Sequence, residues 1–80
     1  MNNYLVTYSG NCTKLNNKQW DILADTEREA VELIYQQVMD DNYFPQDDGS
    51  IKDCSGHTVA DEDDDTIEYD GGCFSAEIID

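Results

Sequence analysis

The sequence predicts an α+β fold: an antiparallel sheet of four or five strands with one helix packed on one face. Three observations predict it. Two early segments alternate apolar and polar residues, a capped segment follows with helical periodicity, and two more alternating segments flank a glycine pair near the end. Eighty residues suffice for one small core, so residues 1–80 are expected to form a single small acidic domain.

Residues 3–9 are rich in β-branched and aromatic side chains and predict the first strand. Residues 18–25 show the same alternation and predict a second strand, antiparallel to the first. Leu23 interrupts the polar side of this second strand. Tyr4, Val6 and Tyr8 are expected on one face of the first strand, with Leu5 and Thr7 on the other. In the second strand, Trp20, Ile22 and Ala24 alternate with Asp21, Leu23 and Asp25.

Residues 26–29, Thr-Glu-Arg-Glu, match a capping box and predict the start of a helix. Arg28 and Glu32 are spaced to pair on its surface. The helix is expected to end near residues 41–42, because Pro45 cannot continue it. Its apolar face is expected to contain Ala30, Val31, Ile34 and Val38, with Tyr35 at the margin.

Residues 41–56 have the composition of a loop, with glycine, proline and several small polar residues. Tyr43, Phe44 and Ile51 are the expected anchors of this loop on the core. Residues 57–60 predict a short third strand.

Gly71 and Gly72 are expected to form the two-residue turn of a hairpin. This turn pairs Tyr69 with Phe74 and places two sets of side chains on opposite faces. The set expected in the core is Tyr69, Phe74, Ile67, Ala76 and Ile78, and the set expected in solvent is Glu68, Asp70, Glu77 and Thr66.

The charge of the chain is large and uneven. The net charge is −15; residues 1–39 carry five acids and three bases, whereas residues 40–80 carry fourteen acids and one base. Solubility of a small domain requires a net charge of only roughly 2 to 8 in magnitude. Such a chain is repelled by nucleic acid and by anionic membranes, so we expect neither as a partner. The expected partner is a basic protein.

Seven of the eleven residues in 60–70 are carboxylates, and none is basic. On a strand, side chains of one face lie about 6.6 to 6.8 Å apart, and duplex DNA carries one charge per ~3.4 Å on each strand. The acidic hairpin is therefore expected to imitate a nucleic-acid backbone. The candidate partner-binding residues are Asp61, Glu62, Asp63, Asp64, Asp65, Glu68, Asp70 and Glu77, with Asp47, Asp48 and Asp53 as a second patch.

The same residues allow four other interpretations. The acids could serve solubility alone, as in a halophile-adapted structural protein, or could bind cations, although no glycine has an EF-hand pattern around it. Zinc would need more than the Cys54-x-x-His57 pair. Catalysis by Cys54 is disfavoured because nearby negative charge opposes a thiolate. We therefore expect no enzyme activity, no cofactor and no metal site.

The chain has three cysteines, an odd number; its first residues do not resemble a leader, and no run in it approaches the ~18 apolar residues of a membrane span. These features favour a cytoplasmic protein, either a monomer or a homodimer.

The segment Trp-Asp-Ile-Leu-Ala-Asp-Thr-Glu-Arg-Glu-Ala, residues 20–30, looks like the strand-into-helix element of very small phage-encoded proteins. With its length and acidity, the chain resembles the small acidic anti-CRISPR proteins, particularly inhibitors of type I Cascade-like complexes. It is also similar in style to uracil-DNA glycosylase inhibitors and antirestriction proteins. The resemblance implies a DNA-mimic inhibitor in the bacterial host cytoplasm, whose partner is a CRISPR surveillance complex or another basic nucleic-acid-binding protein.

Overall fold

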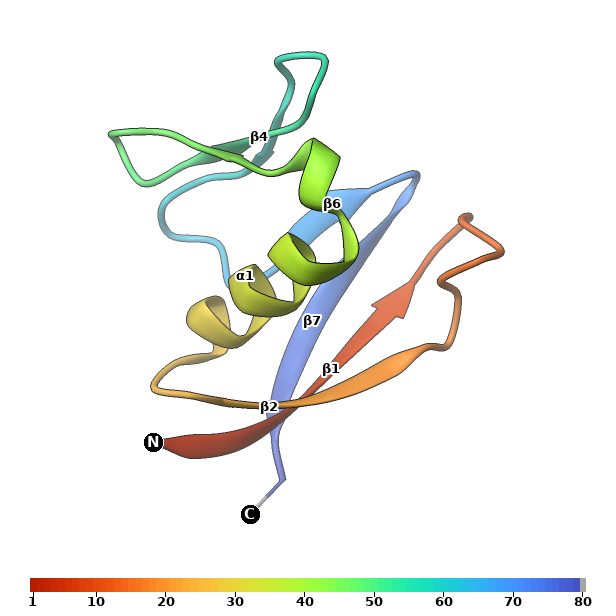
Figure 1. Cartoon of the computed structure of the whole chain (residues 1–80), viewed down its shortest axis with the longest axis vertical. Helices are drawn as coiled ribbons and strands as arrows, with labels where there is room; N and C mark the ends of the chain where they lie inside the picture. The colour runs from red at the N-terminus through yellow and green to blue at the C-terminus, as the bar shows by residue number, and fades with distance from the viewer. Residues whose placement is uncertain (80) are drawn as a thin grey trace.

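Figure 1 shows a computed structural model of the chain, which describes residues 1–79. These residues form a four-stranded antiparallel sheet, ordered β2-β1-β7-β6, and a three-stranded antiparallel sheet, ordered β3-β4-β5, with helix α1 beside both. The predicted α+β class is confirmed. The elements are β1 (Asn2–Ser9), β2 (Gln19–Ala24), α1 (Glu27–Val38), the 3₁₀ turn η1 (Asp40–Asn42), β3 (Phe44–Pro45), β4 (Ile51–Lys52), β5 (Thr58–Ala60), β6 (Ile67–Tyr69) and β7 (Gly72–Ile78).

Strand β1 is the centre of the larger sheet and pairs with β2 on one side and β7 on the other. Its predicted alternation is confirmed, and the face with Tyr4, Val6 and Tyr8 is the buried one. In β2 the expected alternation also holds, with Ala24 buried and Leu23 exposed. One face of the larger sheet therefore packs on the helix, while no helix or strand among residues 1–79 packs on the other.

Helix α1 begins at the predicted cap. The backbone N–H of Glu29 donates to the Thr26 hydroxyl oxygen over 3.1 Å, which satisfies one of the free amides of the first turn. Tyr35 lies inside the core with no exposed surface, so its expected position at the margin was wrong. Its hydroxyl oxygen accepts a hydrogen bond from the side-chain amide of Asn42 over 2.8 Å, and this bond satisfies the polar end of a buried ring.

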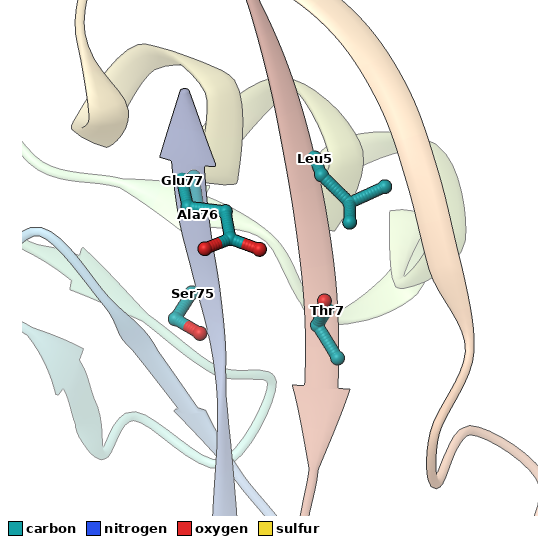
Figure 2. Close-up of a pocket in the computed structure, with 5 residues that line it drawn as sticks. All are labelled: Leu5, Thr7, Ser75, Ala76 and Glu77. Carbon is teal, nitrogen blue, oxygen red and sulfur yellow. The ribbon is translucent and has the colours of Figure 1, made fainter. Parts of the chain in front are cut away.

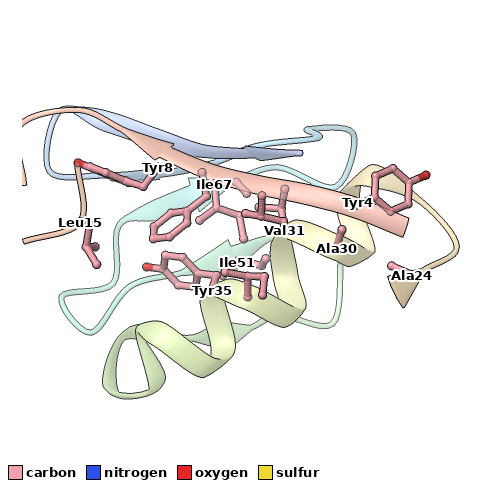
Figure 3. Packing of buried hydrophobic residues seen from close by; sticks show 13 residues of the cluster. Tyr4, Tyr8, Leu15, Ala24, Ala30, Val31, Tyr35, Ile51 and Ile67 are labelled. Atoms are coloured by element: carbon pink, nitrogen blue, oxygen red, sulfur yellow. The ribbon is translucent and has the colours of Figure 1, made fainter. Parts of the chain in front are cut away.

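The core between the larger sheet and the helix is aromatic (Figure 3). Phe74 is its hub: its ring centroid lies 5.0 Å from that of Tyr8, 5.3 Å from that of Tyr35 and 5.8 Å from that of Trp20. The Tyr8 and Tyr35 rings meet Phe74 edge-on, an arrangement worth about 0.5 to 1.5 kcal/mol per pair beyond burial. These rings fix how the helix sits on the sheet.

The second sheet lies where a loop was expected. Strands β3 and β4 fall within residues 41–56, and β5 is the predicted third strand. Ile51 of β4 and Ala60 of β5 pair with each other and enter the core, so Ile51 is an anchor as predicted. Phe44 is 47% exposed, and its expected role as an anchor was wrong.

The hairpin turn differs from the prediction. Tyr69 pairs with Gly72 and Ile67 with Phe74, so the turn residues are Asp70 and Gly71 rather than the glycine pair. Both have positive φ, 49° and 75°, as a type I′ turn requires. The predicted pairs of this hairpin were therefore wrong by two residues, but a shift of two keeps every side chain on its expected face. Ile78 is the exception to the predicted core, being 54% exposed beyond the helix.

The backbone after the end of β1 and the backbone at the start of β7 approach each other closely, which is possible because Gly10 and Gly72 have no side chains. A Cβ added to Gly72 would lie 2.1 Å from the Ser9 carbonyl oxygen, and one added to Gly10 would lie 2.4 Å from the Gly72 Cα. Beneath this crossing the Tyr8 hydroxyl donates to the Tyr69 carbonyl over 2.6 Å. Close backbone contact and this partly buried hydrogen bond together tie β1 to the hairpin.

Replacing Tyr8 with phenylalanine is expected to lower the free energy of unfolding by about 1 kcal/mol, because the hydrogen bond from the Tyr8 hydroxyl to the Tyr69 carbonyl is lost. Urea unfolding followed by Trp20 fluorescence measures the change. Tyr4→Phe is the matched control, since no hydrogen bond of the Tyr4 hydroxyl occurs within the described residues. Equal losses in the two variants would contradict this role of the Tyr8 hydroxyl.

Candidate partner-binding surface

The acidic segment 61–65 is an ordered turn. The backbone N–H of Asp64 donates to the Asp61 carbonyl over 3.1 Å, and the backbone N–H of Asp61 donates to the Asp64 carboxylate over 2.9 Å. All five side chains of the segment are exposed. The backbone is therefore fixed while the carboxylates face solvent.

Arg28 of α1 holds this turn against the helix. Its Nη1 donates to the carbonyl oxygens of Asp61 and Asp64, both over 2.6 Å, and its Nη2 donates to the carbonyl oxygen of Gly49 over 2.9 Å. The Nε lies 3.4 Å from the Glu32 carboxylate, close enough for an ion pair but not aligned as a hydrogen bond. The predicted pair of Arg28 and Glu32 is thus present, and the side chain of Arg28 is only 14% exposed.

Arg28 donates its hydrogen bonds to main-chain carbonyls, and this choice of acceptors leaves the negative charge of the surface unneutralised. The guanidinium group binds the main chain of the acidic turn, so none of its hydrogen bonds is made to the carboxylates of residues 61–65. The turn is held in place by a cation, and its carboxylates stay available to another partner.

A second acidic turn, residues 46–49 between β3 and β4, lies beside the first. Arg28 bonds to both turns, and a Cβ added to Gly49 would lie 3.0 Å from the Cβ of Glu62. In Figure 1 the two loops lie on the same side of the molecule. We call this surface the acidic patch; it consists of Asp47, Asp48, Asp61, Glu62, Asp63, Asp64 and Asp65.

Four of the predicted site residues lie elsewhere. Asp53 is in the turn between β4 and β5, at the other end of the second sheet from residues 46–49 (Figure 1). Glu68 and Glu77 lie on the uncovered face of the larger sheet, and Asp70 is in the hairpin turn. The expected row of carboxylates along the hairpin is therefore not formed, because the acids before Ile67 precede the strand instead of extending it.

Asp48 and Asp53 hold turns together. Asp48 Oδ1 accepts from the Ser50 hydroxyl over 2.6 Å and from the Ser50 amide over 2.9 Å. Asp53 Oδ1 accepts from the Ser55 hydroxyl over 2.7 Å and from the His57 amide over 3.0 Å. Hydrogen bonds from Ser50 and Ser55 hold the pKa of both carboxyl groups below the usual value. These two candidate residues therefore also stabilise the turns in which they lie.

The lowered pKa values predict how stability depends on pH. A carboxyl group with a lowered folded-state pKa stabilises the fold above its unfolded pKa of about 3.9, and this contribution is lost as the pH falls through the folded value. The double variant Asp48→Asn, Asp53→Asn keeps an acceptor oxygen at each site but cannot titrate there. Chemical unfolding between about pH 5 and pH 2 should show the parent losing more stability than the double variant. Parallel pH curves would contradict this.

Three further features of the described residues concern the cysteines, possible metal ligands and possible membrane spans. Cys12, Cys54 and Cys73 are free thiols, and Cys54 and His57 are both exposed in the turn between β4 and β5. Within residues 1–79, no group of three His, Cys, Asp or Glu side chains is placed to hold a metal ion. Across the same residues, no helix has the length and apolar character needed to cross a bilayer.

Comparison with protein families, with curated proteins and with solved structures found no match. The acids and the pairing of Arg28 with Glu32 could be predicted from the sequence, but the hydrogen bonds of Arg28 to main-chain carbonyls 33 and 36 residues away could not.

Proposed function

We propose that this protein is an inhibitor that occupies the basic nucleic-acid-binding groove of another protein and prevents nucleic acid from entering it. The observation that carries the proposal is the way Arg28 fixes the acidic turn through carbonyl oxygens, which leaves the carboxylates of the acidic patch exposed. A solvated acidic loop needs no such support. A ligand benefits from it, because a surface ordered in advance loses less conformational entropy on binding.

The charge density of the acidic patch supports this proposal. The four residues of a β-turn have their first and last Cα atoms within about 7 Å, and residues 61–64 form such a turn with a carboxylate on every residue. One strand of duplex DNA carries roughly two phosphates over that distance. Lysine and arginine side chains placed to hold phosphates would therefore meet at least as much negative charge here.

The target that best fits the resemblance to anti-CRISPR proteins is a type I Cascade-like surveillance complex. Its DNA channel must be basic, because it holds a polyanion. We propose that the acidic patch competes with target DNA for this channel and that the protein itself performs no chemistry. Electrostatic attraction would speed the encounter, most strongly at low salt.

A competition experiment tests the proposal. A guide-loaded type I Cascade-like complex is incubated with this protein, and binding of a fluorescent target duplex is then measured by polarisation. DNA binding should be lost as the protein is added, and more protein should be needed as salt is raised. Parallel assays with a restriction endonuclease and a uracil-DNA glycosylase identify a different DNA-handling target. Unchanged DNA binding in all three assays would overturn the proposal.

A further inference from the structure

The uncovered face of the larger sheet has a charge pattern of its own. On β1, Leu5 pairs with Asp21 of β2 on one side and with Glu77 of β7 on the other. Neighbouring strands lie about 4.8 Å apart, so the two acidic residues flank Leu5 at roughly 10 Å from each other. Both are exposed, and Leu5 is half-buried.

This row lies beside a shallow pocket on the same face. Figure 2 shows Leu5 and Thr7 on β1 next to Ser75 and Glu77 on β7, which line the pocket together with Ala76. The Glu77 carboxylate lies over the pocket between the two strands. The pocket therefore combines an aliphatic wall, two hydroxyl groups and a carboxylate.

The sheet face becomes more apolar toward the chain ends. Leu23 pairs with Asn3 and is 57% exposed, while the backbone N–H of Ile79 donates to the Asn3 carbonyl and its side chain is 46% exposed. Aliphatic surface rimmed by carboxylates is typical of an interaction site. Within residues 1–79, neither helix α1 nor the second sheet covers this face.

We infer that this face is a second contact site and binds a lysine or arginine side chain of a basic protein partner. The aliphatic stem of that side chain packs on Leu5, and its cationic head lies between the carboxylates of Asp21 and Glu77. Long basic side chains combine an apolar stem with a charged end in this way. A second copy of this chain is a poor occupant, because it would bring two further carboxylates against these two.

The inference rests on the proposed function, since the same basic partner is expected to supply the side chain. The probes for it are two acetylated hexapeptides, one of lysine and one of diaminobutyric acid, whose side chain has two methylene groups, compared at about pH 6, where both kinds of amine are protonated. Binding is followed by the amide shifts of the isotope-labelled protein. Hexalysine should move the amides of Leu5, Thr7 and Glu77 and bind about 5-fold tighter at this face than the short-stem peptide.

Two variants test the assignment. In Leu5→Ser, the two peptides should bind to this face with nearly equal affinity. In the double variant Asp21→Asn, Glu77→Gln, the amide shifts on the sheet face should be lost. Glu27→Gln with Asp40→Asn removes the same charge away from this face and should change neither the preference for hexalysine nor the amide shifts. Equal affinities at this face, or shifts confined to the acidic patch, would overturn the inference but leave the proposed function standing. Shifts on the sheet face without DNA competition would overturn the proposed function alone.

Discussion

Replacing Arg28 with methionine is expected to lower the free energy of unfolding by about 3 kcal/mol and to release the acidic turn. Methionine keeps much of the apolar stem but removes three hydrogen bonds from a cation to carbonyl oxygens. A hydrogen bond to a charged group is worth roughly 1.5 to 3 kcal/mol. The freed carbonyls lie near the surface and regain hydrogen bonds to water, so the loss of stability should be smaller than the summed contributions of the three hydrogen bonds.

Two measurements check this expectation. Urea unfolding gives the loss of stability, and cleavage by a protease that cuts before aspartate reports the opening of residues 61–65. Lys14→Met is the matched control, because Lys14 is exposed and its loss changes the net charge equally. Equal resistance of residues 61–65 to the protease in the parent and in Arg28→Met would contradict the claim that Arg28 holds the acidic turn in place.

Neutralising three free carboxylates of the acidic patch is expected to weaken inhibition by roughly 100-fold while leaving the fold intact. The variant is Glu62→Gln, Asp63→Asn and Asp65→Asn; within the described residues these side chains accept no hydrogen bond. An exposed charge pair contributes up to about 1 kcal/mol, and three of them correspond to roughly two powers of ten in affinity. The melting temperature should stay the same or rise, because repulsion within the patch falls.

The control for this variant has the same net charge. Asp25→Asn, Glu27→Gln and Asp40→Asn remove three carboxylates outside the acidic patch. Competition with target DNA is measured for both triple variants at the same salt concentration. Equal losses would show that overall charge matters and that the acidic patch does not.

The elements with a strong local pattern could be predicted from the sequence. Alternation in residues 3–9 and 18–25 marks β1 and β2, and the Thr26 cap marks the start of α1. Each of these signals arises between residues close together in the chain, where propensity and burial agree.

The hairpin and the second sheet show where local patterns fail. Asp70-Gly71 and Gly71-Gly72 are competing turn signals, and the aspartate accepts a left-handed conformation that leaves Gly72 free for its close approach to β1. Strands β3 and β4 have two residues each, too few to show any alternation. Their presence depends on tertiary contacts of Ile51 with the core.

The acids of the candidate site were visible in the sequence, but their arrangement was not. The predicted row needed the acidic block to continue along the hairpin strand, whereas the chain folds it into a turn beside residues 46–49. Arg28 organises this turn by binding carbonyl oxygens. Every residue has such an oxygen, so nothing in the sequence identifies which ones it binds.

Inhibition by the Arg28→Met variant tests the central claim most directly, under conditions in which circular dichroism shows the variant to be folded. This change makes the chain more negative, from −15 to −16. If ordered charge is what the partner recognises, the variant should compete with target DNA about 10-fold more weakly than the parent, while Lys14→Met, with the same net charge, competes as well as the parent. Equal or stronger inhibition by Arg28→Met would contradict the claim, since charge alone would then suffice.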